Sequence, residues 1–171
     1  MAENIPVVPE GETITKSAEA GKYLTFSLHS EEYGVEILKV KEIIGLMVIT
    51  TVPRTPNFIR GVINLRGKVI PVMELRKKFG MESIDDTERT CIIVVDISIQ
   101  GTSVQIGILV DSVSEVINIE SGDIADTPSF GTDINTEFIL GMGKIRDKVI
   151  MLLDIDRVMT TDEISLIRET V

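Results

Sequence analysis

Residues 58–72 read FIRGVINLRGKVIPV, and eighty positions later residues 138–152 read FILGMGKIRDKVIML. The two stretches share a Phe-Ile pair, a glycine two residues after it, and an R-x-K-V-I run in the same place. In each stretch, two runs of β-forming residues flank a short polar segment, which is typical of a β-hairpin. In the first stretch the polar segment is residues 64–67, Asn-Leu-Arg-Gly, whose Asn and Gly tolerate left-handed turn geometry.

A second similarity lies upstream of the first, at a shift of 73 positions. It aligns residues 34–35 with residues 107–108, and the matched positions then continue as Val40/Val113, Glu42/Glu115 and Ile43/Val116. Two similarities in the same order indicate an internal duplication. We therefore expect two β units of about five strands, near residues 22–80 and 89–160. Closure into small barrels would protect their edge strands.

Composition supports a mostly β protein without general affinity for nucleic acid. Ile and Val number 44 and Ala only four, a ratio that favours pleated strands over helices. The net charge of −10 argues against binding to phosphate backbones or to anionic lipid. The chain has no signal-peptide pattern and no apolar run of about 20 residues. These features predict a soluble, cytoplasmic protein without membrane insertion.

The local pattern predicts the order of elements along the chain. Residues 1–21 read as a flexible tail and residues 161–171 as a C-terminal helical extension. Between them we expect strands at 23–28, 33–37, 46–52, 58–65 and 68–72, and short helices at 38–44 and 74–79, the latter ended by Gly80.

The residues that usually carry chemistry are few and scattered. A lone Cys91 and a lone His29 cannot build a zinc site or a nucleophile–base pair, and Cys91 lies in an apolar run typical of a buried thiol. The run at 141–144, Gly-Met-Gly-Lys, lacks the third glycine of a phosphate-binding loop. Four acids in a loop-like stretch lack the spacing of a calcium loop and read as solvated groups: Asp111, Glu115, Asp123 and Asp126. We expect no active site, no metal and no cofactor.

Charge is distributed unevenly along the chain. Residues 54–78 contain seven bases and one acid, whereas residues 111–137 contain seven acids and no base. Oppositely charged segments suit the orientation of protein partners, although they also serve simply as solubilising surface. Arg66 stands among basic neighbours, so it either recruits a distant acid such as Glu42 or offers its planar fork to a partner.

The strings EYGVEI at 32–37, GVINLRGKVIPV at 61–72 and GILVDSVSEV at 107–116 resemble the CheW family of chemotaxis coupling proteins. The resemblance extends from Lys22 to about Ile164. It implies two intertwined SH3-like five-stranded β-barrels with short connecting helices, which agrees with the internal duplication. It also implies an adaptor without catalysis of its own.

The resemblance further implies two partners, the cytoplasmic hairpin tip of chemoreceptors and the regulatory domain of the histidine kinase CheA. The positions that match the family's receptor contact are Val40, Glu42, Gly61, Leu65 and Arg66. The positions that match its kinase contact are Ile117, Ile119, Phe130, Leu140, Met142 and Ile145. Some relatives carry a base near Ala125, and its absence here weakens the electrostatic part of the second contact.

Three alternatives remain open at this stage. The chain could be an adaptor of the CheV-like class that lacks its receiver domain. It could be a small β-barrel nucleic-acid binder that uses the basic segment, although it has no Trp and most of its Tyr and Phe lie in predicted strands. A small hydrolase using the acidic stretch is the third.

Overall fold

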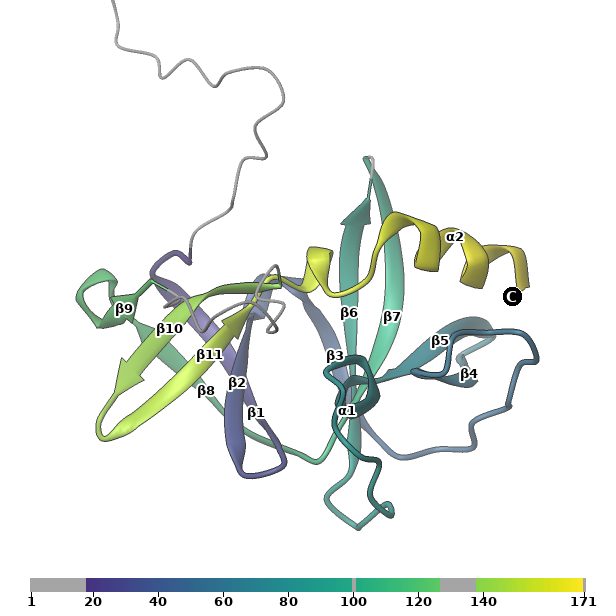
Figure 1. Ribbon diagram of the computed structural model, residues 1–171, viewed down its shortest axis with the longest axis horizontal. Helices are drawn as coiled ribbons and strands as arrows, with labels where there is room; N and C mark the ends of the chain where they lie inside the picture. Colours follow the sequence, from purple (N-terminus) through teal and green to yellow (C-terminus); the bar gives the residue numbers. More distant parts are fainter. Residues whose placement is uncertain (1–17, 100, 127–137, 171) are drawn as a thin grey trace, which may run out of the picture.

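Two β-sheets lie side by side along the long axis of the molecule (Figure 1). The computed structural model describes residues 18–99, 101–126 and 138–170. Its strands are β1 Gly21–Leu28, β2 Glu31–Glu36, β3 Val40–Gly45, β4 Ile59–Leu65, β5 Lys68–Glu74, β6 Cys91–Ile99, β7 Thr102–Val110, β8 Ser112–Ile119, β9 Ile124–Ala125, β10 Ile139–Ile145 and β11 Lys148–Leu153. Its helices are α1 Leu75–Lys78 and α2 Thr161–Thr170, with 3-10 turns η1 Ile37–Lys39, η2 Ser121–Asp123 and η3 Ile155–Arg157.

Each sheet takes strands from both halves of the chain. One sheet has five strands in the order β3-β6-β7-β5-β4, and the other has six in the order β8-β1-β2-β11-β10-β9. The first hairpin of each half has therefore joined the sheet of the other half. This is the expected intertwined arrangement, with the short β9 as a sixth strand that the five-stranded expectation omitted.

The duplication is visible in the pairing. The hairpin β4–β5 corresponds to β10–β11, and β3 corresponds to β8. Each unit also contributes one parallel contact, with Val72 of β5 opposite Gly107 and Leu152 of β11 opposite Gly34. A Cβ on Gly107 would lie 2.8 Å from the Ile92 side chain, and one on Gly34 would lie 3.1 Å from Leu152. The matched glycines thus permit the two parallel pairs to pack closely.

Both sheets curl until their edges meet, and we call them the five-stranded barrel and the six-stranded barrel. In the five-stranded barrel the segment after β3 returns to β4 and pairs through Thr50 and Val62. In the six-stranded barrel the chain continues from β8 through η2 into β9, which pairs with β10. Closure removes free edges that would otherwise pair with other chains.

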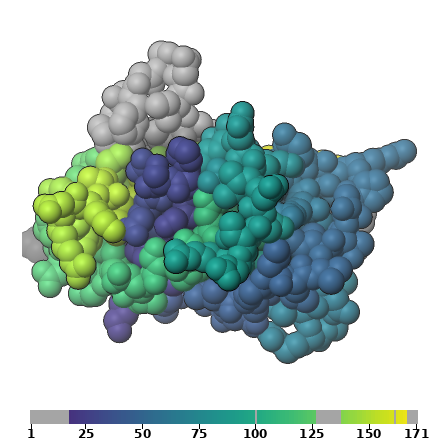
Figure 2. Space-filling model, turned by 90° about the horizontal axis from the view of Figure 1, so that it is seen from below, coloured from purple at the N-terminus to yellow at the C-terminus, as the bar shows by residue number. Residues whose placement is uncertain are grey.

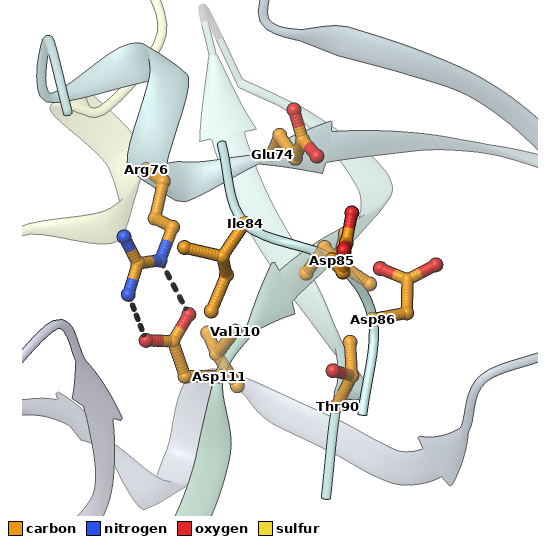
Figure 3. A pocket seen from close by; sticks show the side chains of 9 residues that line it. Glu74, Arg76, Ile84, Asp85, Asp86, Thr90, Val110 and Asp111 are labelled. Atoms are coloured by element: carbon orange, nitrogen blue, oxygen red, sulfur yellow. Dashed lines mark hydrogen bonds and ion pairs between the residues drawn. The ribbon is translucent and has the colours of Figure 1, made fainter. Parts of the chain in front are cut away.

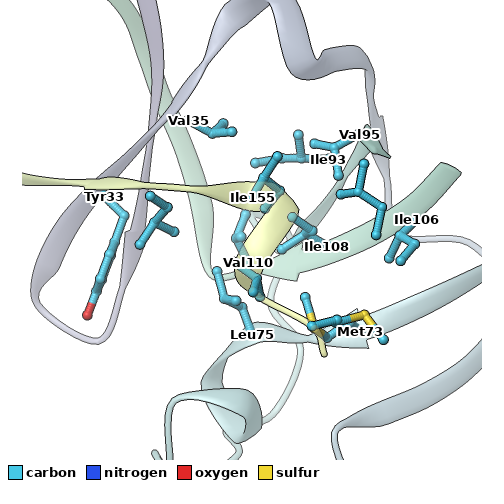
Figure 4. Packing of buried hydrophobic residues seen from close by; sticks show 14 of the residues in the cluster. Tyr33, Val35, Met73, Leu75, Ile93, Val95, Ile106, Ile108, Val110 and Ile155 are labelled. Atoms are coloured by element: carbon cyan, nitrogen blue, oxygen red, sulfur yellow. The ribbon is translucent and has the colours of Figure 1, made fainter. Parts of the chain in front are cut away.

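The largest apolar core lies between the two barrels rather than inside either one. Strands of both barrels, η3 and α2 contribute to it, and Figure 4 shows several of these side chains together, among them Val35, Leu75, Ile93, Val110 and Ile155. Smaller cores fill the two barrels. The shared core makes the two barrels one packed unit.

Two expected elements are wrong. Residues 38–44 do not form a helix, because only Ile37–Lys39 is helical and Val40–Gly45 is a strand with alternating burial. Residues 46–52 do not form a regular strand either. Met47 and Ile49 pack against the core of the five-stranded barrel, but the segment crosses the barrel's open side, where only Thr50 meets a neighbouring strand. The hairpin at 58–72 and the helix before Gly80 are confirmed.

No helix among residues 18–99, 101–126 and 138–170 is long and apolar enough to cross a membrane.

Candidate functional site

Arg66 and Glu42 form an exposed ion pair across the closing edges of the five-stranded barrel. Arg66 lies in the turn between β4 and β5, and Glu42 lies on β3, at the opposite edge of the sheet order. Both guanidinium terminal nitrogens of Arg66 contact the Glu42 carboxylate, one at 3.2 Å. The hydrogen bond from Arg66 lowers the pKa of Glu42. The Arg66 side chain remains 71% exposed, so a partner can reach the pair.

The turn itself presents Arg66. Arg66 has φ 53° and Gly67 has φ 86°, the left-handed geometry of a two-residue hairpin turn that follows the twist of its strands. Asn64, expected to adopt this geometry, instead accepts a hydrogen bond from the Gly67 N–H through Oδ1 at 2.8 Å. The turn thus holds Arg66 in a left-handed conformation at the hairpin tip.

The other expected receptor-contact residues do not all join this pair. Leu65 is half-buried and packs against the core of the five-stranded barrel. Val40 is half-buried at the start of β3 and packs against the core between the barrels. Gly61 is buried, and a Cβ there would lie 2.2 Å from the Thr50 carbonyl oxygen. Gly61 therefore supports the barrel closure, while Arg66 and Glu42 form the accessible part of the set.

Exposed apolar side chains on or next to the strands of the five-stranded barrel were not singled out from the sequence. Ile43 follows Glu42 on β3 and is 45% exposed, and Val69 on β5 is 51% exposed. Leu46 and Val48, in the segment after β3, and Leu38 of η1 are also exposed. The sequence of β3 carried no signal for this exposure, because Ile43 and Ile44 are adjacent and only the burial pattern of the folded strand places Ile43 opposite to Glu42 and Ile44.

The expected kinase-contact residues separate into core and surface. Ile119 and Leu140 are buried in the core of the six-stranded barrel, so their side chains have almost no surface to offer. Ile117, Met142 and Ile145 are half-buried and retain exposed surface. Phe130 lies outside the described residues. Ala125, where a base was missing from the pattern, pairs with Met142 on β9 and β10.

Most of the basic segment is neutralised by acids from elsewhere in the chain. Every base between residues 54 and 78 except Arg54 and Lys68 forms an ion pair with a described residue, and Lys68 donates a hydrogen bond to Gln105. Arg60, for example, binds Asp86 with both terminal nitrogens, at 2.9 and 2.5 Å. The segment therefore does not form the free positive surface that its sequence indicated, which removes the main support for nucleic-acid binding.

Arg76 and Asp111 line a small pocket at the junction of the barrels (Figure 3). Two hydrogen bonds join them, and the Asp111 carboxylate also accepts the His29 N–H at 2.8 Å. Burial would raise the pKa of Asp111, but these hydrogen bonds outweigh it and lower the pKa. Asp111 is thus not the solvated acid expected from the sequence. Across the described ranges, no group of three or more His, Cys, Asp or Glu side chains is arranged to hold a metal.

Cys91 sits on β6 and is half-buried rather than fully buried. Burial raises the pKa of its thiol, opposed by a hydrogen bond with the Val113 backbone. A thiol with a raised pKa is a poor nucleophile at neutral pH.

Comparison with known proteins now identifies the family. Residues 22–163 match the family model described as CheW-like domain. The chemotaxis protein CheW of Klebsiella aerogenes is 37% identical over 157 residues, covering 92% of this chain and 89% of its own length. That of Rhizobium meliloti is 34% identical over 140 residues, covering 82% and 88%. The chemotaxis protein CheV3 of Helicobacter pylori is 30% identical over 129 residues, which are 74% of this chain but 40% of CheV3.

A solved structure supports the same conclusion. The scaffolding protein TtCheW from Thermoanaerobacter tengcongensis superposes with a TM-score of 0.74 at 38% sequence identity, covering 84% of this chain and 95% of TtCheW. The family match covers most of the chain, and its fold and internal duplication agree with the intertwined barrels described above. The chain belongs to the CheW family of non-catalytic chemotaxis scaffolding proteins.

Proposed function

We propose that this CheW-family chain couples the cytoplasmic tips of chemoreceptors to the histidine kinase CheA by binding both, in the cytoplasm. The observation that carries the proposal is the accessible Arg66–Glu42 ion pair on a barrel that also exposes the apolar side chains of Ile43 and Val69. A helical tip could fix its register on the charged pair and bury apolar side chains against exposed apolar groups of the same barrel.

We propose that the kinase contact lies on the other barrel. There Ile117, Met142 and Ile145 retain exposed surface, and Val116 on β8 is 49% exposed. The two barrels lie at opposite ends of the molecule, so a receptor and a kinase could bind at the same time (Figures 1 and 2). The core shared by the barrels would hold the two partners in a defined relative orientation.

Charge reversal at Arg66 tests the receptor contact. In Arg66→Glu the new carboxylate faces Glu42, so we expect affinity for a purified receptor-tip fragment to fall about tenfold or more. The melting temperature should change little, because the substituted Arg66 side chain is 71% exposed. Titration calorimetry measures the affinity. Undiminished binding by a folded Arg66→Glu protein would remove Arg66 from the receptor contact.

The CheV-type relative favours a second candidate within the same class. CheV3 shares this module over part of its length. An adaptor of this type would bind the same partners through the same surfaces. A reconstitution experiment distinguishes a CheW-type coupler from a CheV-type adaptor. Only a self-sufficient coupler restores kinase activation when it is the sole adaptor supplied to receptor membranes and kinase.

A further inference from the structure

The internal duplication repeats a set of surface residues as well as the fold. The matched elements are β3 and β8, and the hairpins β4–β5 and β10–β11. At corresponding positions of these elements, each barrel carries an acid, an arginine, a lysine and exposed or half-exposed apolar groups. The matched pairs are Glu42/Glu115, Ile43/Val116, Leu65/Ile145, Arg66/Arg146, Lys68/Lys148 and Val69/Val149. Figure 2 shows the hairpin β10–β11 in yellow-green at one end of the molecule and segments of the five-stranded barrel in blue at the other.

The two arginines have nearly the same φ, but among the described residues only Arg66 has a carboxylate partner. Arg66 has φ 53° and Arg146 has φ 56°, each in the turn of its hairpin. The Arg66 fork holds the Glu42 carboxylate. Arg146 lines a hollow together with Glu115, but neither side chain forms an ion pair within the described ranges. The six-stranded barrel therefore presents an unoccupied copy of a site that binds a carboxylate in the five-stranded barrel.

The hollow has a rigid floor and a charged rim. Ile150 and Thr25 are buried beneath it, and Thr25 Oγ1 exchanges hydrogen bonds with the Glu115 backbone at 2.9 and 3.1 Å. The floor therefore holds the backbone beneath the Glu115 side chain in place. The half-buried Ile117 and Ile145 supply the apolar wall.

Four charged groups line the hollow, and two of them already pair with each other. Lys148 Nζ lies 3.8 Å from Glu32, whose carboxylate also accepts the Ser114 hydroxyl at 3.4 Å. Arg146 is thus the cation at the rim that lacks a carboxylate, and an unpaired guanidinium is suited to bidentate recognition of one.

We propose that Arg146 is the electrostatic anchor of the kinase contact, and that it binds an Asp or Glu side chain on the kinase next to an aliphatic group seated against Ile117 and Ile145. This rests on the proposed kinase contact of the six-stranded barrel. It assigns to that contact a basic group at the hairpin tip, although the sequence has no base at Ala125.

The test titrates full-length kinase by calorimetry into the full-length chain and into four variants: Arg146→Glu, Arg146→Lys, Arg66→Glu and Ile117→Asp. Arg146→Glu should weaken kinase binding about tenfold or more. The kinase affinity of Arg146→Lys should lie between those of wild type and Arg146→Glu, because lysine keeps the positive charge but cannot form the bidentate contact of a guanidinium. Arg66→Glu is the matched control, with the same residue type at the corresponding hairpin position and a similar φ on the other barrel, and it should bind kinase as wild type. The wild-type affinity should also fall more steeply with added salt than that of Arg146→Glu.

Each outcome decides the proposal. If Arg146→Glu binds kinase as wild type while Ile117→Asp does not, the kinase contact stands and the role of Arg146 is overturned. If the wild-type chain binds no kinase, the proposed function fails and this inference fails with it. Equal loss in Arg146→Glu and Arg66→Glu would indicate a general charge effect and would also overturn the proposal. Arg146→Gln replaces Arg146→Glu if the latter does not melt like wild type.

Discussion

Arg76 and Asp111 join the two barrels through a bidentate ion pair. Arg76 Nε lies 2.7 Å from Oδ1 of Asp111, and a terminal nitrogen lies 2.5 Å from Oδ2. Arg76 belongs to α1, which follows the hairpin of the five-stranded barrel, whereas Asp111 connects β7 to β8 and also accepts the N–H of His29 in the β1–β2 turn. One carboxylate thus ties three segments from both barrels together.

Removal of this carboxylate should loosen the junction. Asp111→Ala leaves the His29 N–H without its acceptor and the mostly buried Arg76 guanidinium with the Glu82 carbonyl oxygen but no carboxylate, so we expect a loss of about 2 kcal/mol in the free energy of unfolding. Urea denaturation followed by circular dichroism measures it. Glu42→Ala is the control, because its partner Arg66 is exposed and the loss of that ion pair should lower the free energy of unfolding much less than the loss of Asp111. Equal losses of unfolding free energy in Asp111→Ala and Glu42→Ala would contradict a stabilising role of the Arg76–Asp111 pair at the junction.

The same carboxylate makes stability depend on acid. Its pKa is lowered in the folded state, since the hydrogen bonds from Arg76 and His29 outweigh the effect of burial. A carboxyl with a lowered folded pKa contributes stability that is complete above its unfolded pKa of about 3.9 and is lost as the pH falls through the folded pKa. The free energy of unfolding of wild type should therefore exceed that of Asp111→Asn at neutral pH, and this difference should shrink as the pH falls below about 5. A difference in unfolding free energy that stays constant from pH 7 to pH 3 would contradict this assignment.

Gly61 should tolerate no side chain. A Cβ at this position would lie 2.2 Å from the Thr50 carbonyl oxygen, and the residue also has φ 155°. Gly61→Ala must therefore displace the segment that closes the five-stranded barrel, at a cost of about 2–4 kcal/mol. Gly45→Ala on β3 is the matched control, because a Cβ there meets nothing within 4 Å and should shift stability by less than about 0.5 kcal/mol. Thermal unfolding of both variants separates the two expectations.

The C-terminal helix α2 begins with a capping box. The Thr160 hydroxyl accepts the Glu163 N–H at 3.1 Å, and the Glu163 carboxylate accepts the Thr160 N–H at 2.7 Å and the Lys78 ammonium at 2.8 Å. Thr160→Ala should cost about 1 kcal/mol and speed amide exchange in the first turn of α2. Thr55→Ala, which removes a hydroxyl that donates to the Val52 carbonyl, serves as the comparison. Unchanged exchange in Thr160→Ala would show that packing of Ile164 alone holds the helix.

Several features were predictable because they depend on local spacing. The hairpin at 58–72 followed from its two β-rich runs and polar turn, and the ion pair of Arg66 with Glu42 was one of the two roles considered for that arginine. The segment at 46–52 was mispredicted because its alternation reflects packing of Met47 and Ile49 inside a barrel rather than pairing with a neighbouring strand. Alternating burial alone cannot distinguish these cases.

By itself the sequence determined the mostly β class, the duplication and the family, because each is carried by residue types at a fixed spacing along the chain. Only the tertiary structure decided which charges remain available. It paired most of the basic segment with acids far away in sequence, buried Ile119 and Leu140, and left Arg146 open where its counterpart Arg66 is held. The physical reason is that ion pairing and burial depend on which strands meet, and here the exchanged hairpins bring together segments from both halves of the chain.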